Sequence, residues 1–118
     1  MIIDARKPPY VNLTMMRGDT ETFSITLRDT KGQPVDFKDG DKIYFTVKTR
    51  AMREEKAVQK VIEEYNKNLA LIEIEAEDTR ELEPGNYVYD IQLTRADGQV
   101  KTLIHKSSFT ILEDVTHE

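Results

Sequence analysis

The sequence predicts an all-β domain with the layout of an antiparallel β-sandwich. Short runs with an apolar residue at every second position recur along the 118 residues, and this is the period of a strand with one buried face. The five glycines lie between these runs, beside residues that favour turns, and none interrupts a run. Short alternating runs separated by turns are typical of β-sandwiches and β-barrels. A chain of this length suits one domain with one core.

The first two strands are expected at residues 11–16 and 22–27, with a turn at residues 17–19 between them. The second run alternates clearly, so its apolar residues fall on one face. These residues are Phe23, Ile25 and Leu27. Residues 29–35 include a proline that cannot donate a ladder hydrogen bond, which predicts a connecting loop. We expect Phe37 to pack beneath this loop.

A third strand is expected at residues 42–49, directly after an Asp-Gly-Asp turn. Residues 51–55 form a charged connection with good helix propensity, so a short helical turn can form there. The apolar spacing of residues 57–63 fits a helix nearly as well as a bulged strand, and we favour the strand. The polar residues 65–68 indicate a hairpin turn that leads into a further strand at residues 69–76.

A single helical turn is expected after that strand, at residues 77–82. Asp78 or Thr79 can cap it, because such side chains accept hydrogen bonds from the first free backbone N–H groups of a helix. The proline that follows ends the turn, and Leu82 is expected to close one end of the core. The Pro-Gly pair in residues 83–86 then marks a tight turn.

The last strands are expected at residues 87–94, 101–106 and 108–112, with an Asp-Gly hairpin turn at residues 96–98. The first of them alternates clearly, with Tyr87, Tyr89, Ile91 and Leu93 on one face. The chain then has about seven or eight strands and one short helical turn, which predicts an immunoglobulin-like sandwich. Such folds often carry a tyrosine whose hydroxyl binds the backbone of a corner. The Tyr-Val-Tyr stretch that begins the first of these strands places a tyrosine at such a corner.

Three segments are expected along the chain. Residues 1–10, with two adjacent prolines, form an extended N-terminal arm, residues 11–113 form the sandwich, and residues 114–118 form a polar C-terminal tail. The arm and the exposed strand edges are the surfaces through which such a domain would bind other proteins.

Composition excludes several kinds of binding and chemistry. The formal net charge is −5 and the isoelectric point is near 5.1, which argues against nucleic acid and anionic membranes as partners. Without cysteine the chain has neither disulfides nor thiolate metal ligands. No apolar run approaches the roughly 20 residues of a membrane helix. We expect synthesis in the cytoplasm without a secretory signal peptide, since no apolar stretch follows a basic start.

The residues that are candidates for chemistry lack the neighbours that such chemistry needs. The two histidines, His105 and His117, are not accompanied by a pattern of nucleophiles or metal ligands. Arg17, Gly18 and Asp19 spell a cell-adhesion tripeptide, but a turn between two strands explains the same residues. We therefore expect no catalytic, cofactor-binding or metal-binding residues, and no cofactor.

Acidic and aromatic residues suggest two weaker alternatives. The turn at Asp39 and Asp41 could bind an ion weakly, but EF-hand spacing is absent, so we favour solvated turns and wet strand faces for the acidic residues. The others are Asp29, Asp36, Glu73, Glu75, Glu77 and Asp78. A carbohydrate-binding sandwich would need an aromatic platform. Its candidates are Tyr44, Tyr65, Tyr87 and Tyr89. Core packing is the expected use of these rings.

Two stretches of the chain together resemble a known family. They are MRGDTETFSITLRDTKGQPVDFKDGDKIYFTVK at residues 16–48 and EDTRELEPGNYVYDIQLTRADGQVKTLIHKSSFTILEDVT at residues 77–116. Their turn and strand motifs resemble those of small structural proteins of bacteriophages and prophages of Gram-positive bacteria. They are similar to the immunoglobulin-like N-terminal domain of phage baseplate upper proteins. The resemblance implies a β-sandwich that assembles in the tail, baseplate or neck of a virion and has no enzyme activity.

These observations predict a non-enzymatic structural module of a phage or prophage virion, made in the bacterial cytoplasm. Its expected partners are other phage structural proteins and further copies of itself, with neither nucleic acid nor membrane among them. The alternative is a carbohydrate- or cell-surface-binding β-sandwich module.

Overall fold

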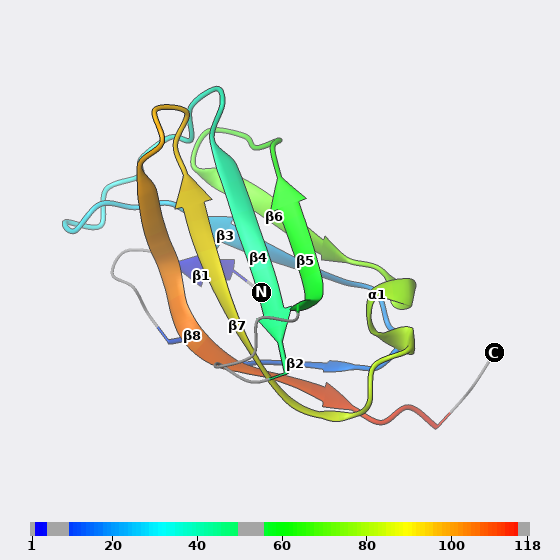
Figure 1. Ribbon diagram of the computed structural model, residues 1–118. Helices are drawn as coiled ribbons and strands as arrows, with labels where there is room; N and C mark the ends of the chain where they lie inside the picture. The colour runs from blue at the N-terminus through cyan, green and yellow to red at the C-terminus, as the bar shows by residue number, and fades with distance from the viewer. Residues whose placement is uncertain (1, 5–9, 50–55, 116–118) are drawn as a thin grey trace.

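The computed structural model describes residues 2–4, 10–49 and 56–115 and has an all-β fold (Figure 1). These residues form eight strands and one short helix, α1 (Ala76–Arg80). The strands are β1 (Ile2–Asp4), β2 (Leu13–Met16), β3 (Glu21–Thr26), β4 (Lys42–Lys48), β5 (Lys56–Ile62), β6 (Leu69–Ile74), β7 (Gly85–Thr94) and β8 (Val100–Leu112). The predicted sandwich of about seven or eight strands with one short helical turn is confirmed.

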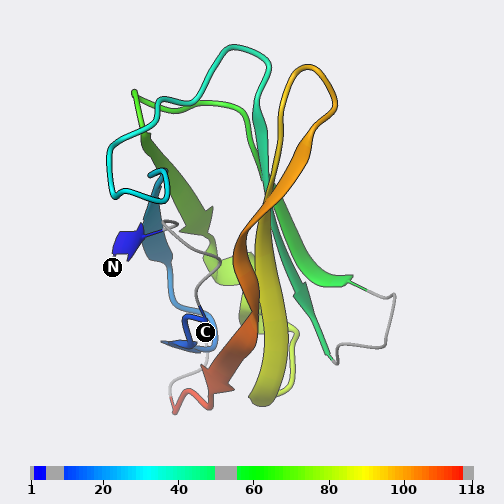
Figure 2. The same ribbon diagram turned by 90° about the vertical axis from the view of Figure 1, so that its left-hand side faces the viewer.

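Two sheets face each other as the layers of the sandwich (Figure 2). The smaller sheet has the strand order β1-β3-β6, and the larger has the order β2-β8-β7-β4-β5. Most neighbours are antiparallel, but β1 runs parallel to β3 and β2 runs parallel to β8. Local alternation does not reveal these parallel pairs, because it specifies the faces of a strand and not its neighbour.

The core lies between the two sheets. The predicted inward-facing residues of β3 and β7 are buried, so the alternation in these strands is confirmed. Three aromatic rings meet in the core, with ring centroids 5.4 to 6.1 Å apart. They belong to Phe45, Tyr89 and Phe109. Each such ring pair contributes about 0.5–1.5 kcal/mol beyond the burial of its area. Leu82 packs against this core, as expected.

Tyr87 pins the corner that precedes the main part of β7. Its hydroxyl donates a hydrogen bond to the backbone carbonyl of Glu83 at 2.7 Å. Burial raises the pKa of Tyr87 above its ordinary value, and the negative charge of Glu83 raises it further. The phenol therefore keeps its proton at neutral pH and remains a donor. The predicted corner tyrosine is confirmed.

Two predicted turns are confirmed. Residues 17–19 form a turn in which the Asp19 N–H donates to the Met16 carbonyl at 3.2 Å. Residues 96–98 join β7 and β8 as an antiparallel hairpin. Phe37 is buried, as expected for a side chain beneath a connecting loop.

The boundaries of two predicted strands are also settled. Residues 57–63 lie largely in β5, so the strand is confirmed and the helical alternative is wrong. The runs expected at residues 101–106 and 108–112 form one strand, β8, whose pairing with β7 changes register in two places. The helical turn considered at residues 51–55 lies outside the described residues.

The predicted cap of the short helix is wrong. The helix begins one residue earlier than the expected residues 77–82, and its N-cap residue is Glu75. Asp78 lies inside the first turn, where its carboxylate accepts a hydrogen bond from the Glu75 N–H at 2.7 Å. Thr79 is buried, and its Oγ1 accepts a hydrogen bond from the Gly18 N–H at 2.8 Å. The threonine hydroxyl therefore binds the turn before β3 and does not cap the helix.

The predicted hairpin between residues 57–63 and 69–76 is wrong, although its turn forms. Asn66 and Leu69 exchange backbone N–H to carbonyl hydrogen bonds of 2.9 Å, and Lys67 has a φ of 56°, as some tight turns require. However, β5 pairs with β4, and β6 pairs with β3 in the other sheet. A turn sequence fixes the local reversal of the chain and leaves the choice of strand partner to the core. The connection therefore crosses from one layer to the other.

The N-terminal segment contacts the sandwich at two places. Within the expected arm, β1 is a strand of the smaller sheet, whereas residues 5–9 lie outside the described residues. Further along, the Val11 N–H donates to the Ser107 hydroxyl at 3.0 Å, and the Val11 carbonyl accepts a hydrogen bond from the Tyr89 hydroxyl. Burial raises the pKa of Tyr89 far above its ordinary value, so this phenol also stays protonated.

Candidate interaction surface

Four strands have a free edge in the described part of the chain, namely β1 and β6 in the smaller sheet and β2 and β5 in the larger. A free edge presents unpaired backbone N–H and C=O groups, which can pair with a strand of another protein. β5 and β6 lie on the same side of the sandwich, in different layers (Figure 1). Their edges therefore face the same opening.

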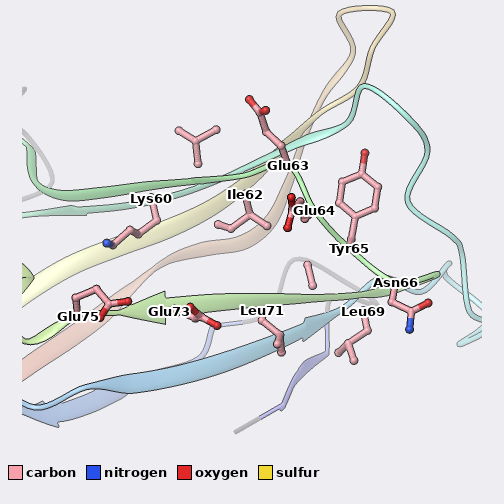
Figure 3. A pocket seen from close by; sticks show the side chains of 12 residues that line it. Lys60, Ile62, Glu63, Glu64, Tyr65, Asn66, Leu69, Leu71, Glu73 and Glu75 are labelled. Carbon is pink, nitrogen blue, oxygen red and sulfur yellow. The ribbon is translucent and has the colours of Figure 1, made fainter.

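An open groove of about 860 Å³ lies between β5 and β6 (Figure 3). We call it the edge groove, and it is lined by residues 60–66 on the β5 side and by residues 69–71, 73 and 75 on the β6 side. Figure 3 shows Lys60 and Ile62 on one wall and Leu71 and Glu73 on the other.

Two tertiary contacts hold the walls of the edge groove in place. At the connection between the strands, the Tyr65 hydroxyl donates to the Lys38 carbonyl at 2.5 Å, and the Asp41 carbonyl lies 3.2 Å from the same oxygen. Toward the other end, Lys60 of β5 pairs with Asp78 of α1, with Nζ and Oδ2 2.7 Å apart. This ion pair spans the gap between the layers, so it fixes β5 relative to the end of β6.

The lining of the edge groove is predominantly acidic. It contains four glutamates, Glu63, Glu64, Glu73 and Glu75. Its positive charge comes from Lys60, which is already paired with α1. Lys42 of β4 approaches Glu63 at 3.5 Å, but exposed pairs of this kind contribute little. The groove therefore favours a positively charged occupant.

Exposed apolar side chains accompany these charges. Val61 on β5 is 46% exposed and Leu71 on β6 is 47% exposed, and both line the edge groove. Large apolar side chains beside a free strand edge are a feature of surfaces that contact other proteins.

The register between β3 and β6 shows which backbone groups of β6 point into the opening. The Leu27 N–H donates to the Asn68 carbonyl at 2.9 Å, just before β6 begins. Hydrogen-bonded pairs alternate along an antiparallel ladder, so residues 70, 72 and 74 direct their backbone groups toward β3. The N–H and C=O groups of Leu71 and Glu73 are therefore directed away from β3, toward the free edge.

The sequence predicts a solvated turn at Asp39 and Asp41, and this prediction is wrong for Asp41. The Asp41 side chain is 1% exposed, and its Oδ2 accepts hydrogen bonds from the Lys38 N–H at 2.8 Å and from the Arg95 guanidinium at 2.6 Å. Arg95 begins the connection between β7 and β8 and supplies the charge that a buried carboxylate needs. The contact ties two distant loops together, so we assign Asp41 a structural role.

Other acidic residues lie where the sequence places them. Asp29 Oδ1 accepts hydrogen bonds from the Lys31 and Gln33 N–H groups at 2.9 Å each, which stabilises the loop after β3. Glu73 and Glu75 are exposed, as expected for the wet face of a strand.

The adhesion-like tripeptide is tied into the fold. Arg17 Nε donates to Asp114 Oδ1 at 2.7 Å, and the Gly18 N–H donates to Thr79 Oγ1 at 2.8 Å. These contacts use the arginine side chain and the central amide, so they support the interpretation of residues 17–19 as a structural turn.

The histidine and tyrosine candidates do not form a shared site among the described residues. His105 is exposed on β8, with its ring centroid 5.4 Å from that of Tyr10. His117, and the expected tail from residue 116 onward, lie outside the described residues. Of the tyrosines proposed for an aromatic platform, Tyr87 and Tyr89 are buried. Tyr44 alternates with buried residues of β4, and Tyr65 is bonded in the β5–β6 connection, so these rings do not share a face.

Asp90 is a titratable group with an altered pKa outside the edge groove. It lies half-buried on β7, close to Lys48 and Lys106. Burial raises the pKa of Asp90, and the positive charge of Lys48 partly opposes this increase.

Across the described ranges, no group of three or more histidines, aspartates or glutamates is placed to hold a metal ion. In the same ranges, no helix has the length and apolar character needed to cross a membrane.

Sequence reasoning missed the edge groove, because the wrongly predicted hairpin would have joined β5 to β6 and closed it. One signal was available. Lys60 falls on the inward face of β5, between Val58 and Ile62. A charge on the inward face is typical of a strand at the edge of a sheet and not of one enclosed by neighbours.

Comparison with known proteins supports the fold. The sequence matches no protein-family model and no curated protein. In three dimensions the chain is similar to the N-terminal domain of phage TP901-1 ORF48, with a TM-score of 0.53 and 12% sequence identity. The likeness covers 97% of this chain and 95% of that one. The two chains thus share a fold over nearly their whole lengths, and a shared fold leaves function to be argued separately.

Proposed function

We propose that the chain is a non-enzymatic structural module of a phage or prophage particle, located in its tail, baseplate or neck. The observation that carries the proposal is the fold likeness to the N-terminal domain of phage TP901-1 ORF48 over 97% of this chain. The resemblance of residues 16–48 and 77–116 to the immunoglobulin-like N-terminal domain of phage baseplate upper proteins supports it from the sequence. Within the particle, the baseplate is the location that we favour.

The module would act by presenting rigid strand edges to its neighbours. Its core fixes the two sheets against each other, and the edges of β5 and β6 open on the same side. Pairing along such edges uses backbone donors and acceptors and requires neither a reactive side chain nor a cofactor. The proposed partners are other virion proteins, bound through these edges, and further copies of the chain, bound through the N-terminal segment.

The direct test is to look for the protein in phage particles. Particles released by the bacterium that encodes the chain would be purified on a density gradient and probed with an antibody against the isolated domain. We expect the protein in the particle fraction, with gold-labelled antibody at the baseplate end of the tail in electron micrographs. Label at the head–tail junction would move the location to the neck. Absence of the protein from intact particles would contradict the proposal.

A second test addresses the N-terminal segment. Deletion of residues 1–10 removes β1 from the edge of the smaller sheet, and we expect weaker self-association in sedimentation measurements. Circular dichroism would show whether the shortened chain is folded. Unchanged self-association of a folded, shortened chain would rule the segment out as an assembly surface.

A further inference from the structure

The four free edges differ in their protection against strand addition. β1 and β2 have only three and four residues, and short edges are poor templates. β5 has seven residues but carries Lys56 and Lys60, and its pairing with β4 is irregular near Lys48. Lysines and irregularities are common protections of an edge. β6 has six residues, Leu-Ala-Leu-Ile-Glu-Ile, with neither lysine nor proline and with unbroken register against β3.

The unprotected edge also offers the chemistry that strand addition needs. Leu71 and Glu73 direct their backbone N–H and C=O groups away from β3, so they are available to a new neighbour. The edge groove beside them has a volume of about 860 Å³ and is open to solvent along β6 (Figure 3).

We propose that the free edge of β6 binds an extended segment of a partner protein, which joins the three-stranded sheet as a fourth strand. The segment lies in the edge groove and alternates basic with apolar residues. This inference rests on the proposed function and names the edge and the partner chemistry of that interaction.

The side chains of β6 and of Glu75, which directly follows it, select these residue types. In paired strands, directly opposite side chains have Cβ atoms about 4.5–5.5 Å apart, so opposite charges stabilise the pair and like charges destabilise it. Basic side chains of the segment would pair with Glu73 and Glu75, which are exposed beside the edge. Leu71 lies on the same face of β6 as Glu73, so a basic residue also stands opposite it and covers it with its aliphatic stem. The apolar residues of the alternating segment then lie on the inner face, beside Ala70, which lines the edge groove.

Charge argues against a second copy of this chain as the occupant. Each copy has a net charge of −5, and the edge groove is lined by four glutamates and one lysine. A second copy would bring more negative charge to an acidic surface, whereas a basic segment meets a complementary one.

The first experiment compares two peptides on the intact domain. One fluorescein-labelled peptide of about eight residues alternates lysine with valine, and the other alternates glutamate with valine. Fluorescence anisotropy should show binding of the lysine peptide at least about tenfold tighter than that of the glutamate peptide. Nuclear magnetic resonance shifts on binding should be largest for the amides of Leu71 and Glu73.

The second experiment removes one backbone donor from the edge. Leu71→Pro deletes an N–H group that does not take part in the ladder to β3, and proline is tolerated at such edge positions. We expect this variant to bind the lysine peptide about tenfold more weakly. Leu71→Thr is the matched control, because it shortens the side chain but keeps the N–H group, and its binding should stay closer to that of the unchanged domain.

A modified peptide tests the same backbone hydrogen bonds without altering the protein. If circular dichroism shows that Leu71→Pro does not fold, the lysine peptide is N-methylated at alternate residues and offered to the unchanged domain. N-methylation along the peptide edge that meets β6 removes the N–H donors that strand pairing uses, so we expect the same loss of binding.

The third experiment tests the charge pairing. The double variant Glu73→Gln, Glu75→Gln should bind the lysine peptide about three- to tenfold more weakly. Its control is Glu21→Gln with Glu113→Gln, which removes the same charge from exposed positions outside the groove and should change binding by no more than about twofold.

The outcomes separate this inference from the proposed function. Equal affinity for the two peptides, or full affinity after N-methylation, would overturn the inference even if the protein is present in particles. A dimer of the domain that Leu71→Pro disrupts would make a second copy the occupant and would overturn it as well. Tight, edge-dependent binding of the lysine peptide would support the inference even if particles lacked the protein.

Discussion

The buried pair of Asp41 and Arg95 should stabilise the fold by an amount that one substitution can measure. The two residues are 54 positions apart and join the turn before β4 to the connection after β7. Asp41 Oδ2 lies 2.6 Å from the guanidinium and 2.8 Å from the Lys38 N–H, and within the described residues its Oδ1 has no hydrogen-bond partner. Arg95→Met removes the positive charge and keeps most of the aliphatic stem.

The expected loss follows from the exposure of the two side chains. Removing one partner of a buried ion pair typically costs about 3–5 kcal/mol, because an uncompensated charge stays buried. The Arg95 side chain is 22% exposed and Asp41 keeps its bond to the Lys38 N–H, so both solvent and backbone relieve part of this cost. We therefore expect the free energy of unfolding to fall by about 3 kcal/mol, out of a total of roughly 5–15 kcal/mol.

Urea unfolding followed by circular dichroism measures this loss. With an m-value of about 2 kcal/mol/M, a loss of about 3 kcal/mol lowers the midpoint by roughly 1.5 M. Arg80→Met is the matched control, since Arg80 is exposed on α1 and its replacement should change the free energy of unfolding by less than about 0.5 kcal/mol.

A midpoint that falls by less than about 0.5 M in Arg95→Met would refute this reasoning. Asp41→Asn in the same background provides a second check. The amide carries no charge to bury, so the double variant should lose less stability than the sum of the two single losses. Additive losses would mean that the two side chains do not interact.

Three further predictions concern single residues. Tyr87→Phe should lower the free energy of unfolding by about 1 kcal/mol in urea, because the corner carbonyl loses its donor. Asp90 has a raised pKa in the folded state, so folding becomes less favourable as pH rises through the carboxyl range. Asp90→Asn should therefore melt at a higher temperature than the parent at pH 7 and at the same temperature near pH 3. Gly40 has a φ of +91°, and an added Cβ would lie 2.7 Å from the Ala96 Cβ, so Gly40→Ala should cost more in urea unfolding than Gly98→Ala, whose Cβ meets open space.

The faces of the strands could be predicted from the sequence because they depend on local geometry. Successive side chains of a strand point to opposite sides, so the alternation in β7 identified its buried residues before any neighbour was known. The corner at Tyr87 followed in the same way, since its hydroxyl reaches a carbonyl only four residues away. Features of this kind require no knowledge of distant parts of the chain.

The choice of strand partners could not be predicted, because it depends on distant residues. The turn at residues 66–69 reverses the chain equally well within one sheet or between two. What separates β5 from β6 is their pairing with β4 and β3, together with the reach of Lys60 across the gap to Asp78. The burial of Asp41 depends in the same way on Arg95, which a local view of an Asp-Gly-Asp turn does not include.

The same unpredicted choice of strand partners leaves the edge of β6 free, and a free edge without lysine or proline needs another protection. Glu73 and Glu75 provide one, because they place negative charge beside the free backbone groups. Lysines at these positions would attract further copies of a chain whose net charge is −5. Glutamates repel such copies and attract a basic segment, so the two side chains favour one class of partner and oppose another. On this reasoning, the carboxylates that keep the edge of β6 open also determine the charge of the segment that can close it.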